Sequence, residues 1–192
     1  MNSNSPALAC LLTLAAWLAG AVWFDLRERR IPNPWVAAGI VCGVALQALA
    51  PAGAGLFDRN WGGLGLLQAL LGAAAGLALF MPLYVLRALG AGDVKLLAMV
   101  GAWLGPQLLL GATLLTLLFG GALSLVVMLV SRSSRQVLGN VRVMLTTTLI
   151  SAHAGQLTTL EAPSASRVRL PYAVAIALGT LGQVGWQLFG AR

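Results

Sequence analysis

The stretch Gly90-Ala91-Gly92-Asp93-Val94-Lys95 decides how the rest of the chain is interpreted. It places an aspartate beside two glycines and a lysine, at the start of an apolar run. An ionisable side chain at membrane depth is costly, so an acid in this position indicates a function. The partner that we expect for Asp93 is Asp25, which follows the first apolar run. We therefore predict that aspartates from two separate helices form one catalytic pair.

The composition of the chain indicates an integral membrane protein. Of its 192 residues, 59% are hydrophobic and 9% are charged, and the mean hydropathy is +0.87. Soluble domains carry about 25% charged residues. Apolar runs of the length that a transmembrane helix needs, about 20 residues, recur along this chain instead. A membrane barrel would show alternating segments of about ten residues, and the sequence has none. We expect an all-α membrane protein, a single domain over residues 1–192 built as a bundle of about six transmembrane helices.

The boundaries between the expected helices are set by prolines, glycines and charged residues. Pro32 and Pro34 lack an amide donor and restrict the residue before them, which separates the first two runs. Gly105-Pro106 separates the fourth run from the fifth. Residues 143–160 are less apolar and rich in threonine, and we expect an interfacial helix there. The expected spans are residues 6–24, 35–50, 63–86, 94–104, 107–130 and 171–188.

The charge distribution predicts the topology. Twelve Lys and Arg meet five Asp and Glu, for a formal net charge of +7. The bases occupy short segments between apolar runs, so we interpret them as topology determinants and contacts with anionic lipids, and we exclude nucleic acid as a partner. If both termini are periplasmic, ten of the twelve bases are cytoplasmic, and only Arg59 and Arg192 lie outside. Asp25 and Asp93 then share the cytoplasmic side.

Two further features bear on processing and on metal binding. No charged side chain precedes the first apolar run and the basic cluster follows it, so we expect a retained helix and not a cleaved signal. The two cysteines, Cys10 and Cys42, lie inside apolar runs and form no CxxC pair. We expect free thiols and no metal site.

A pair of carboxylates can hydrolyse a peptide when the two share one proton. The ionised group takes a proton from water, and the protonated group polarises the scissile carbonyl. The two titrate as a pair, so the sequence does not say which aspartate is the base and which the acid. Gly90 and Gly92 would let an extended substrate strand approach closely, or would only break a helix at a bend.

Three blocks of sequence resemble the type IV prepilin peptidases, which are intramembrane aspartyl proteases of the GxGD class. Asp25 to Asn33 is similar to the family's aspartate followed by Arg-x-Ile-Pro-Asn. Gly90 to Ala98 is similar to its GxGD-hydrophobic-Lys-Leu block. Arg169 to Ala173 resembles the Pro-Tyr motif that opens the last helix.

The resemblance implies an enzyme that removes a short basic leader from pilin-like precursors. Cleavage would take place at the cytoplasmic face of the bacterial inner (plasma) membrane, with prepilin or pseudopilin precursors and the pilus assembly machinery as partners. Asp25 and Asp93 match the catalytic aspartates, and neither a metal nor an organic cofactor is implied. Eight other residues match or adjoin the motifs and are expected to support the site, the substrate or the fold. They are Gly90, Gly92, Lys95, Arg29, the Pro32-Asn33 pair and the Pro171-Tyr172 pair.

One departure from the larger members of that family narrows the activity that we expect of this chain. Those members carry a cytoplasmic insert with paired CxxC motifs and also N-methylate the new N-terminus. This chain has no CxxC and no long loop after its first run, so it resembles the short peptidases of tight-adherence (Flp) pilus systems, and we expect no methyltransferase activity.

Two other classes remain as alternatives. A non-enzymatic carrier or assembly scaffold could also hold acids in the membrane, but a proton carrier needs ionisable residues along a path across the bilayer, whereas the charged groups here cluster at one face. A presenilin-type protease with another substrate would place its first aspartate in a Tyr-Asp context, which is absent from this chain.

Overall fold

The computed structural model describes residues 5–58, 60–86, 88–130 and 171–190. Within these ranges the regular structure is helical, apart from two isolated β-bridges. The prediction of an all-α fold is therefore confirmed. The interfacial helix expected at residues 143–160 lies outside the described residues. The elements are α1 (Ser5–Glu28), α2 (Asn33–Leu49), α3 (Leu66–Val85), α4 (Ala91–Val130), α6 (Tyr172–Gly185) and the π-helix η1 (Trp186–Gly190).

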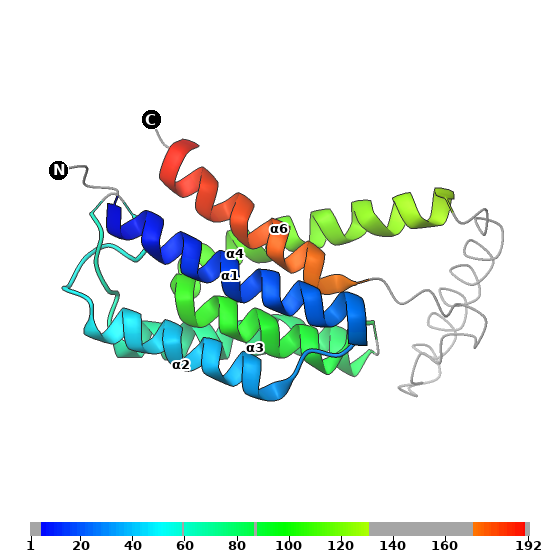
Figure 1. Cartoon of the computed structure of the whole chain (residues 1–192), viewed down its shortest axis with the longest axis horizontal. Coiled ribbons are helices and arrows are strands. Elements are labelled where there is room, and N and C mark those ends of the chain that lie inside the picture. The colour runs from blue at the N-terminus through cyan, green and yellow to red at the C-terminus, as the bar shows by residue number, and fades with distance from the viewer. Residues whose placement is uncertain (1–4, 59, 87, 131–170, 191–192) are drawn as a thin grey trace, which may run out of the picture.

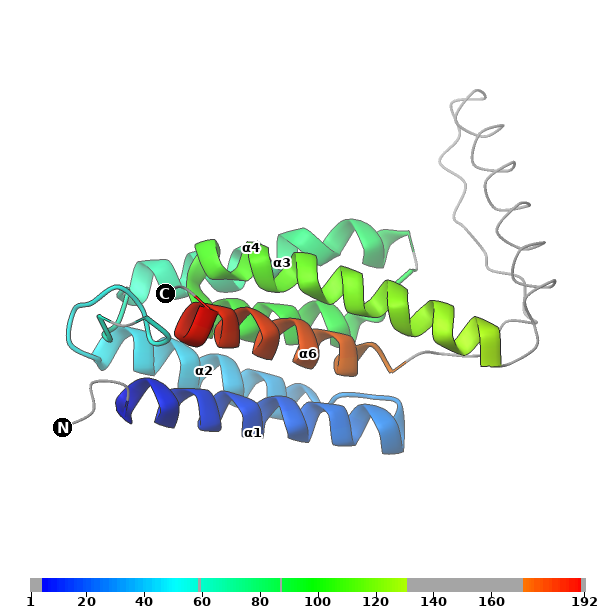
Figure 2. The same cartoon turned by 90° about the horizontal axis from the view of Figure 1, so that it is seen from above.

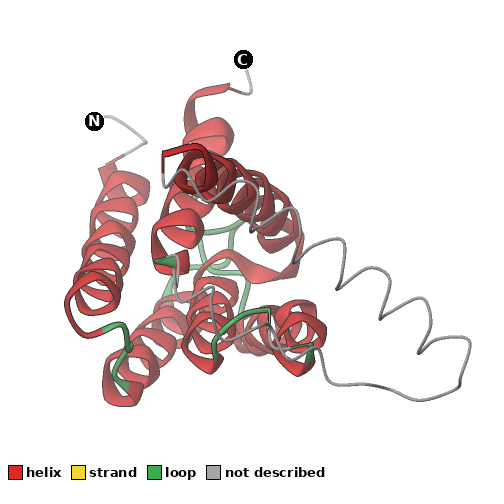
Figure 3. Cartoon of the chain, turned by 90° about the vertical axis from the view of Figure 1, so that its right-hand side faces the viewer, coloured by secondary structure: helices red, strands yellow, loops and turns green. Residues whose placement is uncertain are grey.

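The helices lie side by side in one elongated bundle and alternate in direction (Figures 1 and 2). α1 and α3 end at the same end of the bundle, and α2, α4 and α6 begin there. We call this the site end, and Figure 3 looks at the bundle from it. The end of α1, which carries Asp25, and the start of α4, which carries Asp93, therefore lie at the same end of the bundle.

α4 is broken at Gly105-Pro106, as the sequence predicts. Gly105 has φ 72° and ψ 170°, outside the helical region. Glycine adopts a positive φ without the steric cost that a Cβ would add, and proline cannot donate its nitrogen to the preceding turn. The first part, residues 91–104, runs away from the site end, and the second part, residues 106–130, runs back toward it (Figure 1).

The first part of α4 packs against α3 with the two backbones in contact. A Cβ on Gly72 would meet the carbonyl oxygen of Gly101, and a Cβ on Gly101 would meet that of Gly72. One turn further along α3, a Cβ on Gly76 would stand 2.5 Å from the carbonyl oxygen of Leu97. The small residues at 72 and 76 thus form the close helix contact that their spacing predicts. This contact fixes the helix that carries Asp93.

A buried glutamine closes the end of the bundle opposite the site. Gln47 is 1% exposed. Its Nε2 donates to the carbonyl oxygen of Trp103 (2.7 Å), and its Oε1 accepts from the backbone nitrogen of Leu64 (2.8 Å). The segment between α2 and α3 packs back onto the bundle here, with Leu56 and Phe57 fully buried. Gln47 therefore ties the break in α4 to α2 and to the start of α3.

Among the residues that the structure describes, four helices are long and apolar enough to cross a membrane, which supports the membrane class. They are Pro6–Glu28, Leu66–Val85, Ala91–Val127 and Tyr172–Gly190, with Asn33–Leu49 as a shorter apolar helix. The count of six spans stays a prediction. Two boundaries differ from expectation at the site end: α1 continues one turn past Asp25, and α4 begins at Ala91, so that both aspartates lie within terminal helical turns.

Candidate active site

The two aspartates predicted to act together stand at the site end on different helices. Asp25 is in the last turn of α1, and Asp93 is in the first turn of α4. Their carboxyl groups are within range of direct electrostatic interaction. The fold therefore brings together two acids that are far apart in the sequence.

Asp93 is held by the start of its own helix. Its Oδ2 accepts a hydrogen bond from the backbone nitrogen of Gly90 (3.1 Å). Gly90 directly precedes α4, so this is the contact in which an acid three residues into a helix satisfies an unpaired amide at its N-terminus. The helix dipole also favours negative charge at this position. A Cβ on Gly90 would lie 3.3 Å from Asp93 Oδ2, which is tighter than ordinary contact. Gly90 thus positions the carboxylate of Asp93 through this hydrogen bond.

Asp25 is held by the start of another helix. Its Oδ2 accepts from the backbone nitrogen of Ala173 (3.3 Å), in the first turn of α6. The residue before that helix is Pro171, which makes no side-chain cap. The first amides of a helix need a partner from elsewhere, and Asp25 supplies one of them from α1. The first turn of α6 and the last turn of α1 are thus joined at a candidate catalytic carboxylate.

Tyr172, the first residue of α6, packs against α3 and the second part of α4. Its ring meets that of Phe80 edge-on, with the centroids 6.0 Å apart and the planes at 64°. On another side it lies against Gly120, where a Cβ would be 2.8 Å from the tyrosine hydroxyl oxygen. Tyr172 is also within electrostatic range of Asp93. The residue adjoins both aspartates: one electrostatically, the other through the next residue, Ala173.

The remaining predicted support residues join α2 to α4. Lys95 Nζ donates to Asn33 Oδ1 (3.0 Å), which links the first turns of these helices. Pro32 is the residue that precedes α2, in extended conformation with ψ 132°. A Cβ on Gly92 would lie 3.7 Å from atoms of Ile31, an ordinary contact distance, so the fold does not require glycine at this position.

Arg29 closes α1 in a left-handed conformation. Its φ is 51°, the region that usually calls for glycine after a helix. Its backbone nitrogen donates to the carbonyl oxygen of Asp25 (3.0 Å), while its side chain is exposed. Arg29 therefore ends the helix directly after Glu28.

Sequence reasoning did not identify Phe80, Gly120 or the amide of Ala173 as neighbours of the pair. Phe80 and Gly120 lie in apolar runs where nothing distinguishes them from other core positions. The amide of Ala173 could have been suspected, because Pro171-Tyr172 opens a helix without a capping side chain. In the described part of the chain, His, Cys, Asp and Glu form no group of three or more that could hold a metal.

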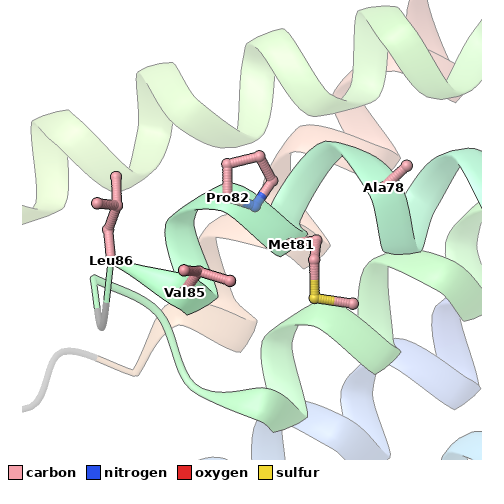
Figure 4. A pocket seen from close by; sticks show the side chains of 5 residues that line it. All are labelled: Ala78, Met81, Pro82, Val85 and Leu86. Carbon is pink, nitrogen blue, oxygen red and sulfur yellow. The ribbon is translucent and has the colours of Figure 1, made fainter. Parts of the chain in front are cut away.

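An open apolar hollow of about 620 Å³ runs along the outer face of α3 (Figure 4). Its lining is Ala78, Met81, Pro82, Val85 and Leu86. None of these side chains can donate or accept a proton, so this hollow has no part in acid–base chemistry. Its lining suits contact with lipid tails.

Fold and site together define a class: a helical membrane protein that presents two carboxylates, each tied to a helix N-terminus, at one end of its bundle. Comparison with known families gives the more particular statement. The chain belongs to the type IV leader peptidase family, whose model matches residues 12–125. The matched region contains both aspartates and ends before α6. No curated protein and no solved structure matches the chain.

Proposed function

We propose that the protein is an intramembrane aspartic endopeptidase that removes the leader from type IV pilin-like precursors. Membership of the type IV leader peptidase family makes the chain a membrane peptidase and points to leader peptides as its substrates. The observation that carries the proposed mechanism is the placement of Asp25 and Asp93 at one end of the bundle, within electrostatic range of each other.

In this mechanism the two carboxyl groups share one proton. The ionised carboxylate takes a proton from a water molecule, whose oxygen attacks the scissile carbonyl carbon, and the protonated carboxyl gives its proton to the carbonyl oxygen. Collapse of the tetrahedral intermediate returns a proton to the leaving nitrogen and breaks the C–N bond. The amide of Gly90 donates to Oδ2 of Asp93, and the amide of Ala173 donates to Oδ2 of Asp25. These bonds would hold both groups still while Oδ1 faces water and substrate.

Two observations support a cytoplasmic site and a short-form enzyme. Exposed Arg27, Arg29 and Arg30 follow or adjoin Asp25 at the site end, and basic residues next to membrane helices mark the cytoplasmic side. α1 ends at Glu28 and α2 begins at Asn33, so the connection is too short for an inserted domain. We therefore infer Flp-type precursors as substrates, at the inner membrane with its anionic lipids and beside pilus assembly components.

The test is leader cleavage by variants that change the acid but keep its shape. Tagged prepilins, including a short Flp-type precursor, are co-expressed with wild type, Asp25→Asn and Asp93→Asn. Asparagine can still accept the amide hydrogen bonds, so these variants should fold, yet neither supplies a carboxylate. Glu28→Gln is the matched control, because it makes the same change at an exposed acid in the same turn as Asp25. Processing is measured by gel shift and N-terminal sequencing.

We expect cleavage by wild type and Glu28→Gln and at least a 1000-fold loss in both aspartate variants at equal membrane levels. Residual cleavage of a tenth or more by either aspartate variant would refute the dyad. If wild type cleaves no precursor, the carrier or scaffold alternative gains support.

A further inference from the structure

The structure points to Gly120 as a positioning residue for the catalytic carboxylate of Asp25, acting through Tyr172. We propose that the missing side chain at Gly120 lets the Tyr172 ring lie against α4, which sets the start of α6 where Ala173 can bind Asp25. This inference rests on the proposed function and deepens it, because it adds a residue on the second part of α4 to the site.

The first step is the contact between Gly120 and Tyr172. A Cβ built on Gly120 would stand 2.8 Å from both the hydroxyl oxygen and Cε2 of the ring and 2.9 Å from Cζ. The ring and α4 would have to separate by about 0.6 Å to reach the 3.4 Å at which ordinary contact begins. Only glycine allows the present position of the ring.

The second step is the other contact of the ring. It meets Phe80 edge-on, and Phe80 is 0% exposed. Core packing is dense, so a ring wedged against a fully buried neighbour passes on part of any displacement and does not absorb all of it. We infer that this part reaches the backbone of Tyr172, at the first residue of α6.

The third step is the hydrogen bond that this backbone carries. Ala173 follows Tyr172 directly, and its amide lies 3.3 Å from Asp25 Oδ2. That distance is already at the long end for an N–H···O bond. A shift of about 0.6 Å away from the carboxylate breaks it, and Asp25 then loses the only donor that the described residues give it. A misplacement of about 1 Å at a catalytic group can cost about 100-fold in rate.

The neighbouring residue provides a matched control. Gly121 lies on the same helix, and a Cβ built there meets nothing within 4 Å. Gly120→Ala and Gly121→Ala therefore make the same chemical change one residue apart, with the same gain in helix propensity. Only the first pushes on Tyr172.

The experiment measures kcat and KM for cleavage of a purified prepilin by the full-length enzyme in lipid nanodiscs. We expect Gly120→Ala to lower kcat 10- to 100-fold with KM within twofold of wild type, and Gly121→Ala to match wild type in both. Equal kinetics for the two alanine variants would overturn the inference and leave the dyad untouched, as would a Gly120→Ala effect confined to KM. If wild type itself does not cleave, the proposed function fails first.

A second variant keeps the test valid if Gly120→Ala does not fold. Phe80→Leu removes the ring that supports Tyr172, and Phe189→Leu makes the same change at a 60% exposed position. We expect Phe80→Leu to lower kcat at least threefold more than Phe189→Leu does, with KM unchanged. A kcat equal to that of Phe189→Leu would overturn the inference.

Discussion

Replacing Gln47 with leucine should destabilise the bundle at the end opposite the site. Gln47 satisfies two buried backbone groups at once, the carbonyl of Trp103 and the amide of Leu64. The carbonyl of Trp103 lies in the last turn before the break in α4, where the final carbonyls of a helix have no amide partner within that helix. Leucine fills a similar volume but can bind neither group, so the change isolates the hydrogen bonds from the packing.

The size of the destabilisation follows from the number of buried polar groups that lose their hydrogen-bond partner. Leaving one buried backbone donor or acceptor unpaired costs about 1–3 kcal/mol, so two cost about 2–6 kcal/mol. The leucine side chain recovers about 1–2 kcal/mol through added apolar burial. The midpoints of the two ranges differ by about 2.5 kcal/mol, which is the net loss that we expect in the free energy of unfolding.

The assay is reversible unfolding by SDS in mixed micelles, followed by circular dichroism. Gln68→Leu is the control, because it makes the same substitution at an exposed position of α3. A Gln47→Leu variant as stable as Gln68→Leu would refute the reasoning. It would mean that water or lipid headgroups satisfy the carbonyl of Trp103 without help from α2.

Two further predictions concern the contacts that hold α4. Lys95→Met and Asn33→Ala should lower kcat by similar factors, because both remove the same 3.0 Å hydrogen bond. The double variant should have a kcat no lower than that of either single variant. Additive losses in kcat would show that the two residues act separately. Gly76→Ala should lower the free energy of unfolding by about 1–3 kcal/mol, because its Cβ would be 2.5 Å from the carbonyl oxygen of Leu97. Gly185→Ala, where a Cβ meets open space, should be neutral or slightly stabilising in the same unfolding measurement.

The sequence predicts most of the features that depend on local pattern. Apolar runs indicate membrane helices, and the charges between them place both aspartates at the same end. The break at Gly105-Pro106 and the close contact of α3 through Gly72 and Gly76 follow from the conformational properties of glycine and proline, and the structure has both. These features need no knowledge of which helix lies beside which.

The features that the sequence does not predict all depend on contacts between distant segments. The amide of Ala173 and the carboxylate of Asp25 are 148 residues apart, and no local pattern pairs them. The burial of Phe57, in the connection between α2 and α3, depends likewise on how these two helices pack. Asp25 was expected to close its helix, but α1 continues to Glu28 and ends where Arg29 adopts the left-handed conformation. The roles of the individual site residues stay predictions.

The early break in α4 has a consequence for the depth at which the chain turns. Residues 91–104 rise about 21 Å as a helix, whereas the hydrocarbon core of a bilayer is about 30 Å thick. A helix of this length that starts at one face of the core ends inside it, so the turn at Gly105-Pro106 lies at membrane depth. Residues 96–104 are buried within the bundle, so protein and not lipid surrounds the approach to this turn. Non-helical backbone at membrane depth is tolerated only in such surroundings. The bundle thus takes the place of solvent for an interrupted helix, and the side chain of Gln47 is part of that solvent substitute.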